Sequence, residues 1–214
     1  MGEKKVKNGW FYEYEATTEY RKIYDYELTD VRYILGERFN SDIEKSLICI
    51  GMNPSMAMPN NLDPTLKRVQ KYAKENGEYG SWYMLNVYPQ RATNPNNMDM
   101  DETYDKGIHL QNIIAIQALL SSIPEADVWC AWGAIINDSK RRFLSDLLFG
   151  NDEKKIRGIL SLFGYKYDFK AYGATRKGYP KHPLLMSRED KLKRLNDVGL
   201  HTLSNRINNS LISK

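Results

Sequence analysis

Three polar side chains stand where apolar segments of the sequence end, and their types suit the recognition of a flat polar ligand. Asn86 directly follows the apolar residues 82–85. A buried amide needs partners, and it offers both a donor and an acceptor to one edge of a planar group such as a nucleobase. His182 stands in a basic loop, where a neutral imidazole would donate a hydrogen bond to a ligand oxygen. Asn53 follows another apolar run and adds a third amide.

Each of these residues also has a purely structural interpretation. Asn53 precedes a proline, and this pair is common in turns because Asn tolerates unusual backbone angles. Asn86 would cap a local turn, and His182 would be a structural or solvated histidine. Asp63 also precedes a proline, which makes it a natural helix N-cap. Convergence of these side chains in one crevice would favour a binding site over unrelated turns.

Four basic residues lie near these positions in the sequence. Arg91 stands in a turn-rich stretch, and Arg176, Lys177 and Lys181 lie in the loop that leads to His182. They form either a solvated surface or a set of contacts to phosphate groups. The net charge of +4 and the pI of about 8.8 are compatible with a polyanionic partner but do not establish one.

The polar positions follow segments that have the composition of buried strands. Residues 47–50 form a continuous apolar run, which is typical of a strand buried on both faces. Helices are predicted from Asp63 to Gly77, over residues 105–123 and 139–149, and in the tail from residue 187. The predicted strands are residues 31–38, 47–51, 82–87, 128–132 and 165–172.

The alternation of strands and helices predicts the α/β class. We expect a three-layer α/β/α sandwich with a mostly parallel central sheet of about four or five strands. Ligands of such sheets bind in the crevice at the carboxyl ends of the strands. Asn53, Asn86 and His182 all lie at or after strand ends, so we expect them to meet in that crevice.

The bulk composition predicts one domain with an N-terminal arm. A chain of 214 residues, 42% hydrophobic and 27% charged, is ordinary for one globular core. Residues 31–214 are assigned to a single α/β domain and residues 1–30 to the arm. The arm either packs on the domain or presents aromatic rings that stack on bases. Its tyrosines are Tyr12, Tyr14, Tyr20, Tyr24 and Tyr26.

Several classes of protein are disfavoured. No run of about 18 apolar residues suggests a membrane span, and the N-terminus lacks the apolar region of a secretory signal. Cys49 and Cys130 each lie in an apolar run and are expected to be reduced core thiols. No Cys/His cluster has zinc spacing, so we predict no metal and no cofactor. Together these features predict a cytoplasmic protein, and we expect a monomer.

Several short motifs resemble, in their order, the pattern of a bacterial and phage family known as domain of unknown function 1643. The resemblance runs from about residue 31 to residue 186, so it leaves the arm and the tail unexplained. The motifs are Arg32-Tyr33, Asn53-Pro54-Ser55, Asp63-Pro64-Thr65, Asn86, Arg91-Ala92-Thr93, Trp132-Gly133 and Gly178-Tyr179-Pro180-Lys181-His182-Pro183-Leu184.

The same motifs resemble those of the uracil-DNA glycosylase superfamily. The motif around Asn53 is similar to the superfamily's water-activating motif in its Asn-bearing, mismatch-glycosylase version. The strand ending at Asn86 resembles the one whose terminal Asn recognises uracil, and the His182 loop resembles the one whose His bonds a pyrimidine oxygen. The resemblance implies that Asn53 and His182 are catalytic, that Asn86, Ser55, Met52 and Asp63 bind the base, and that Arg91, Arg176, Lys177 and Lys181 contact DNA phosphates.

The resemblance implies a DNA glycosylase, an enzyme that hydrolyses the N-glycosidic bond of a flipped-out pyrimidine in DNA. Asn53 would hold the water, while Asn86 and a neutral His182 would donate hydrogen bonds to the departing base. In the uracil-specific branch an Asp replaces Asn53, and a Tyr follows the proline where Ser55 stands here. The pocket would therefore admit uracil or a bulkier 5-modified pyrimidine.

Two other functions stay open at this point. One is a non-catalytic sensor or adaptor that binds a nucleotide or nucleobase, and the other is an enzyme that acts on free nucleotides. Ser55, and a His182 loop that is shorter than the corresponding loop of the glycosylase superfamily, favour these functions. The basic loop and the order of the motifs favour the glycosylase. A glycosylase of this kind would serve DNA repair or defence against phage.

Overall fold

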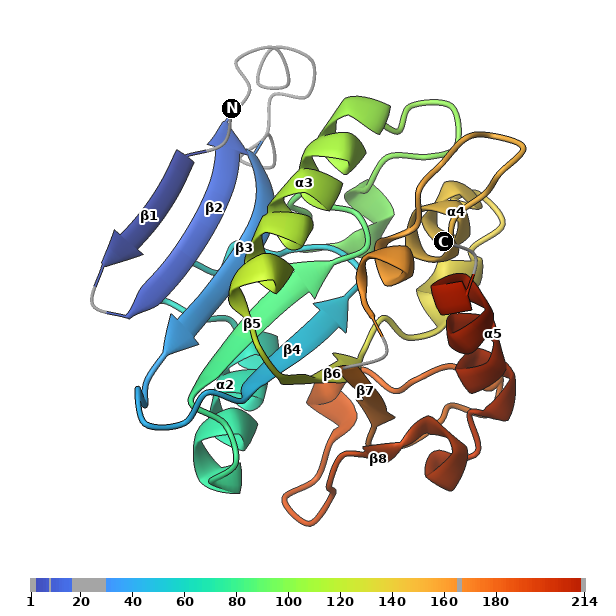
Figure 1. Ribbon diagram of the computed structural model, residues 1–214. Helices are drawn as coiled ribbons and strands as arrows, with labels where there is room; N and C mark the ends of the chain where they lie inside the picture. Colours follow the sequence, from blue (N-terminus) through green and yellow to red (C-terminus); the bar gives the residue numbers. More distant parts are fainter. Residues whose placement is uncertain (1–2, 8, 17–29, 165–166, 213–214) are drawn as a thin grey trace.

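One eight-stranded sheet runs through the protein in the order β1-β2-β3-β5-β4-β6-β7-β8 (Figure 1). The computed structural model describes residues 3–7, 9–16, 30–164 and 167–212. The strands are β1 (Glu3–Lys7), β2 (Trp10–Ala16), β3 (Asp30–Arg38), β4 (Ser46–Gly51), β5 (Ser81–Asn86), β6 (Ala126–Cys130), β7 (Tyr167–Ala171) and β8 (Lys193–Arg194). The α-helices among the described residues are α2 (Pro64–Asn76), α3 (Lys106–Ser122), α4 (Phe143–Phe149) and α5 (His201–Ile212).

The α/β class is confirmed, but the sheet is mixed rather than mostly parallel. Strands β5, β4, β6 and β7 form a parallel group at its centre. The predicted strand over residues 31–38 is β3, which runs antiparallel to β5. Strands β1, β2 and β8 add further antiparallel pairs at the two edges. The prediction missed these edge strands because they are short or rich in charged residues, so they lack the apolar run of a buried strand.

The N-terminal residues assigned to an arm contribute two of these edge strands. β1 and β2 form a hairpin, which pairs with β3 through β2. The sequence carries a signal for it, because Asn8-Gly9 is a typical pair for a two-residue turn and Gly9 has φ 80°. Tyr12 and Tyr14 lie in β2. Tyr20, Tyr24 and Tyr26 lie outside the described residues.

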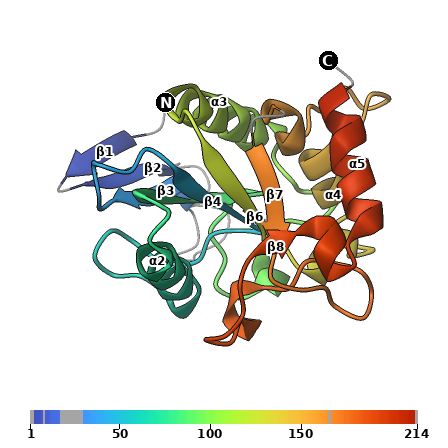
Figure 2. The same ribbon diagram turned by 60° about the horizontal axis from the view of Figure 1, so that its bottom comes forward.

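Helices α2 and α3 cover opposite faces of the sheet because the chain reverses its direction of progress at β4. α2 leads from β4 to β5, whereas α3 leads from β5 to β6 on the other side of β4. Figure 2 shows the two helices on either side of the sheet. This reversal creates a topological switch point at the carboxyl end of β4, where open α/β sheets bind ligands.

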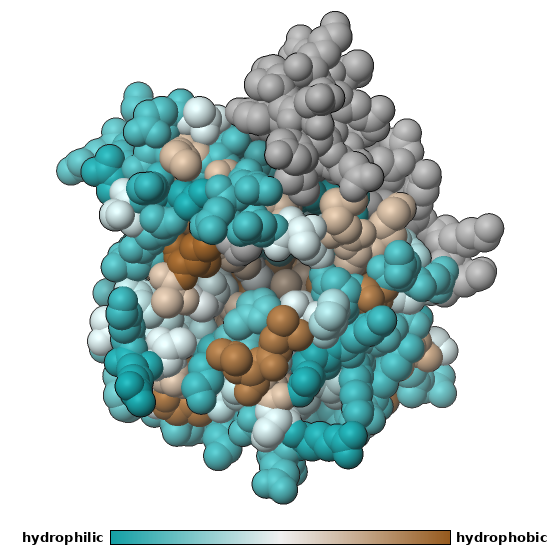
Figure 3. Space-filling model, turned by 180° about the vertical axis from the view of Figure 1, so that it is seen from behind, coloured by the Kyte–Doolittle hydropathy of each residue, from teal (hydrophilic) through white to brown (hydrophobic). Residues whose placement is uncertain are grey.

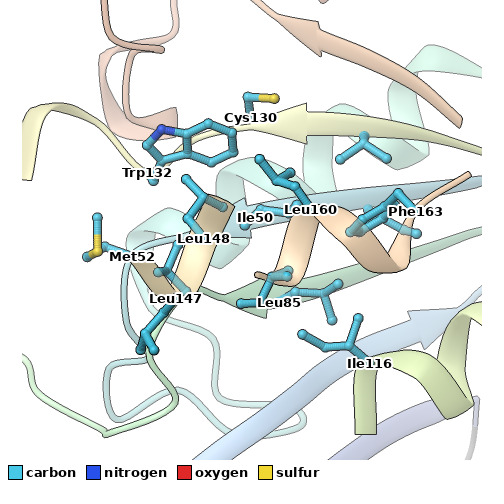
Figure 4. Packing of buried hydrophobic residues seen from close by; sticks show 14 of the residues in the cluster. Ile50, Met52, Leu85, Ile116, Cys130, Trp132, Leu147, Leu148, Leu160 and Phe163 are labelled. Carbon is cyan, nitrogen blue, oxygen red and sulfur yellow. The ribbon is translucent and has the colours of Figure 1, made fainter. Parts of the chain in front are cut away.

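Two hydrophobic cores fill the spaces between these layers. One lies under α2, and it includes Leu47 and Cys49 of β4. The other contains Ile48 and Ile50 with α3, α4 and α5. Figure 4 shows part of this second core, where Ile50 and neighbouring strand residues pack beside the apolar side chains of α4. Cys49 and Cys130 are buried in different cores and are not disulfide-bonded, as predicted.

The predicted ends of α2 and α3 are confirmed. The Asp63 side chain accepts a hydrogen bond from the Leu66 N–H at 2.8 Å, and Gly77 ends α2 with φ 79°. Asp105 caps α3 in the same way, through the N–H of Gly107. The tail is α-helical only from His201, because residues 193–194 pair with β7 as β8 and Leu195–Val198 form the short 3₁₀ helix η5. No helix in the described segments is both long and apolar enough to cross a bilayer.

Candidate active site

A cavity of about 400 Å³ opens at the carboxyl ends of the central parallel strands, on the face covered by α2. Its volume is in the range of small-molecule sites. Figure 3 shows a hollow with hydrophobic side chains beside it on the face that lies behind α3 in Figure 1. Five of the predicted site residues line the cavity, namely Met52, Asn53, Ser55, Asp63 and His182.

Asn53 is held in a fixed orientation by its amide N–H groups. Its Nδ2 donates to the carbonyl of Ala92 at 2.8 Å and to that of Pro54 at 3.1 Å. With both N–H groups occupied, Oδ1 is the remaining polar atom of the side chain, and it is a hydrogen-bond acceptor. Asn53 is therefore oriented to accept a hydrogen bond from a water or a ligand donor in the cavity.

Two buried arginines support the loop that carries Asn53 and Ser55. Arg91 is 3% exposed, and its guanidinium donates to the carbonyls of Ser55 at 3.0 Å and Ala57 at 3.3 Å. Arg32 is fully buried and donates to the same Ala57 carbonyl at 2.8 Å. The predicted phosphate contact at Arg91 thus has a different role, because a buried guanidinium bonded to backbone carbonyls fixes a loop.

Asp63 joins the first turn of α2 to this loop. One carboxylate oxygen accepts from the Leu66 N–H, and the other accepts a short hydrogen bond from the Ser55 hydroxyl. Asp63 is therefore both the helix cap and a wall of the cavity. The sequence predicts Asp63 as a helix N-cap and as a base-binding residue, and its position allows both roles.

His182 also lines the cavity, at the start of the short helix η4 (Pro183–Leu185). Its Nδ1 accepts from the Leu184 N–H at 3.4 Å, so the neutral ring carries its proton on Nε2. Burial lowers the pKa of His182, and the nearby Asp63 carboxylate opposes only part of this effect. The result is a neutral histidine whose Nε2–H has no hydrogen-bond acceptor among the described residues.

The lowered pKa of His182 predicts that stability depends on pH. Below its ordinary value of 6.5, the unfolded chain binds a proton at His182 that the folded chain does not. The free energy of unfolding is therefore expected to fall as the pH drops through 6.5 and to level off below the lowered pKa. Urea unfolding between pH 8 and pH 5 measures this fall. The buried His109 also has a lowered pKa, so His182→Gln should make the fall shallower without removing it. An unchanged pH dependence in that variant would contradict the assignment.

Asn86 lies directly behind the cavity rather than on its wall. The residue is fully buried, and among the described residues neither Nδ2 nor Oδ1 has a hydrogen-bond partner. Gly51 lines the cavity and lies next to Asn86, since a Cβ placed on Gly51 would lie 3.3 Å from the Asn86 Oδ1. From the other face of the sheet, Asn112 donates to the Asn86 carbonyl at 2.9 Å and fixes the end of β5. A buried amide without partners is costly, and it calls for an explanation.

The basic residues before His182 lie on a hairpin formed by residues 173–181. Ala174 pairs with Pro180, and Arg176 and Lys177 are exposed at the tip. Lys181 points elsewhere, with its Nζ 5.9 Å from the centre of the Tyr172 ring. The hairpin therefore presents two of the three predicted phosphate contacts to solvent next to the His182 segment.

The structure brings five of the ten predicted site residues together and adds Trp132, Thr93 and Arg32 to the lining of the cavity. Gly133, which follows a predicted strand, also lines the cavity. Gly133 has φ 69° and ψ −163°, a conformation that favours glycine. The sequence signal for Arg32 is its position inside an apolar strand, because a charged residue is rarely buried there unless it has a partner.

Within the described segments, no group of three or more His, Cys, Asp or Glu side chains is arranged to hold a metal ion.

The fold and the site define a mixed α/β protein with a ligand cavity at the switch point of its sheet. The family model of DUF1643, a protein of unknown function, matches residues 32–184, which is more than two thirds of the chain. The chain belongs to this family. No curated protein and no solved structure matches it.

Proposed function

We propose that the protein binds a pyrimidine nucleobase in this cavity and hydrolyses its N-glycosidic bond in DNA. The observation that carries the proposal is the buried amide of Asn86, which has no hydrogen-bond partner among the described residues and lies beside Gly51 in the cavity lining. A ligand that presents complementary donors and acceptors at that depth would satisfy both amide atoms. The edge of a pyrimidine carries such groups in one plane.

His182, which lines the cavity, would act on the same ligand. Its Nε2–H would donate to a carbonyl oxygen of the pyrimidine, and because the ring is neutral it would keep this proton during the reaction. When the bond between C1′ of the sugar and the ring nitrogen breaks, its electron pair moves to the nitrogen and is shared with the carbonyl oxygens. A hydrogen bond from a fixed donor stabilises this developing anion more than it stabilises the neutral base, so it lowers the barrier to bond cleavage.

Asn53 would position the water that completes the reaction. Its Oδ1 accepts a hydrogen bond from that water, whose oxygen forms the new bond to C1′ while a proton is lost to solvent. Two hydrogen bonds support this role, one from Asn53 to the Ala92 carbonyl and one from Arg91 to the Ser55 carbonyl. They fix the loop before the ligand binds. Preorganised polar groups of this kind need no rearrangement at the moment of reaction.

One observation favours binding without hydrolysis as the second candidate. Asp63 is the carboxylate that lines the cavity, and both of its oxygens already accept hydrogen bonds, from Ser55 and from the Leu66 N–H. It is therefore poorly placed to take a proton from water. A sensor or adaptor needs only the recognition half of the site.

Base release from DNA separates these candidates. Single- and double-stranded oligonucleotides that carry uracil or 5-substituted pyrimidines are incubated with the protein, and free base is measured by mass spectrometry. A glycosylase releases at least one of these bases and leaves an alkali-labile site. Ser55→Tyr should reduce release of 5-substituted pyrimidines more than release of uracil, because a ring would fill the cavity beside Pro54.

Tight binding of a nucleoside without release from any oligonucleotide would leave the sensor as the function. Absence of both binding and release would reject the nucleobase site itself. Lys106→Ala is a suitable control, because Lys106 is exposed at the start of α3, on the opposite face of the sheet from the cavity.

A further inference from the structure

A groove with an excess of positive charge begins where the cavity ends. It has a volume of about 660 Å³ and runs between α2 and the segment of residues 186–190. Its charged lining residues are the cations Lys67, Arg68, Lys71 and Arg188 and the acids Glu75 and Asp190. The groove is therefore lined by four cationic and two acidic side chains, so two positive charges are not balanced by acids in its lining.

The same two chain segments form the cavity and the groove. Thr65 and Leu66 in the first turn of α2 line the cavity, and Lys67 and Arg68 line the groove directly after them. On the other wall, Leu184 lines the cavity and Met186 lines the groove. Figure 2 shows α2 and this segment on the same side of the sheet. The cavity and the groove are thus formed by neighbouring residues of the same two segments.

The walls of the groove are fixed by hydrogen bonds. Arg68 donates a short hydrogen bond to the Met186 carbonyl, and the Tyr72 hydroxyl accepts from the Leu192 N–H at 3.1 Å. These contacts tie the segment after His182 to α2. The groove is consequently present before any ligand binds.

The charges that remain available are those of Lys67 and Arg188. The acids in the groove are already engaged, since Glu75 lies 3.6 Å from Lys71 and Asp190 accepts from the Ser187 N–H. Among the described residues, no ion pair involves Lys67 or Arg188, and both are exposed. Lys67 and Lys71 are also like charges four residues apart on one helix, an arrangement that disfavours the helix.

We infer that this groove binds the phosphate backbone of the DNA strand whose base enters the cavity. The inference rests on the proposed function and makes it more specific, because it names the surface that would hold the DNA strand outside the cavity. Lys67 and Arg188 would each contact a phosphate, and such contacts position a strand without reading its sequence.

The test is the double variant Lys67→Glu, Arg188→Glu, whose binding to a fluorescein-labelled single-stranded oligonucleotide is measured by anisotropy at several salt concentrations. Affinity should fall on the order of tenfold or more, because two cations become anions. The slope of log affinity against log salt should fall by about 1.4, or 0.7 for each lost phosphate contact. The matched control is Lys106→Glu, Lys155→Glu, which makes the same change in net charge at two exposed lysines away from the groove.

Calorimetry with thymidine or deoxyuridine separates a failure of the groove from a failure of the proposed function. If the groove variant loses oligonucleotide affinity but binds the nucleoside like the wild type, the inference holds. If it binds the oligonucleotide no worse than the control variant does, the groove is not the phosphate track. Equal losses of nucleoside and oligonucleotide affinity would also overturn the inference, because the cavity would then be damaged. A wild type that binds no nucleoside, together with loss of DNA affinity in the groove variant, would reject the nucleobase site and keep the groove.

Discussion

Replacing Asn86 with leucine is expected to stabilise the protein and, in the same variant, to eliminate nucleobase binding. Both side-chain amide atoms of Asn86 are buried and have no hydrogen-bond partner in the described part of the chain, which costs about 1–3 kcal/mol for a buried polar group. Leucine has a similar shape and needs no partner, so the free energy of unfolding should rise by up to that amount. Urea unfolding measures the gain.

The loss of function in Asn86→Leu should be large. A site that hydrogen-bonds a polar ligand rejects a mismatched partner by about 10⁴-fold in favourable cases, because buried polar groups are left unpaired. We expect nucleoside affinity and base release to fall by at least 10²-fold. An amide with a purely structural role predicts the reverse, namely lower stability and unchanged binding.

Asn112→Leu is the matched control for this variant. Asn112 is also a buried amide, and its Oδ1 has no partner among the described residues, but its Nδ2 donates to the Asn86 carbonyl from the opposite face of the sheet. Its replacement removes a hydrogen bond that exists, so stability should fall by about 1 kcal/mol or more. Stabilisation by both leucine variants would mean that the gain in Asn86→Leu reflects general hydrophobicity and not a site prepared for a ligand.

Replacing Asn53 with alanine is expected to slow base release on the order of 10²-fold while nucleoside affinity changes little. The reason is that its Oδ1 would act on the attacking water, which matters in the transition state and not in the bound ground state. Single-turnover kinetics of base release and calorimetric binding of a nucleoside measure the two effects separately. Full-rate release by Asn53→Ala would mean that another residue holds the water.

Arg91→Ala controls for loosening of the loop. Asn53 also bonds the Ala92 carbonyl, so its loss relaxes the same loop that Arg91 fixes through Ser55 and Ala57. Relaxation alone should lower stability, affinity and rate together in Arg91→Ala. A fall in rate without a fall in affinity in Asn53→Ala is therefore the mark of a role in the chemical step.

The central part of the fold could be predicted from the sequence because its signals are local and strong. The apolar run of β4 and the residues Asp63 and Gly77 at the ends of α2 each determine an element or a boundary without help from distant residues. The polar residues that follow parallel strands then had to lie at one edge of the sheet. Asn53 and His182 are therefore expected in one cavity, and the structure has both in its lining.

The remaining features depend on contacts between distant segments. Arg91 has the sequence context of a surface cation, and only the fold shows that it is buried against the loop of Ser55. The groove beside Lys67 likewise requires Arg188 from a segment more than a hundred residues away. The hairpin before β3 is an exception, since Asn8-Gly9 signalled it and the charged residues around it obscured the signal.

The most direct test of the nucleobase site is an NMR titration that follows the side-chain amide of Asn86. The two protons on Nδ2 can be assigned by their disappearance in Asn86→Asp, and the titrant is deoxyuridine or a 5-substituted analogue. If the ligand edge pairs with this amide, its proton and nitrogen signals should shift downfield as the ligand saturates the cavity, and His182 should respond in parallel. Saturation that leaves the Asn86 side-chain signals unchanged would contradict recognition of a nucleobase by this residue.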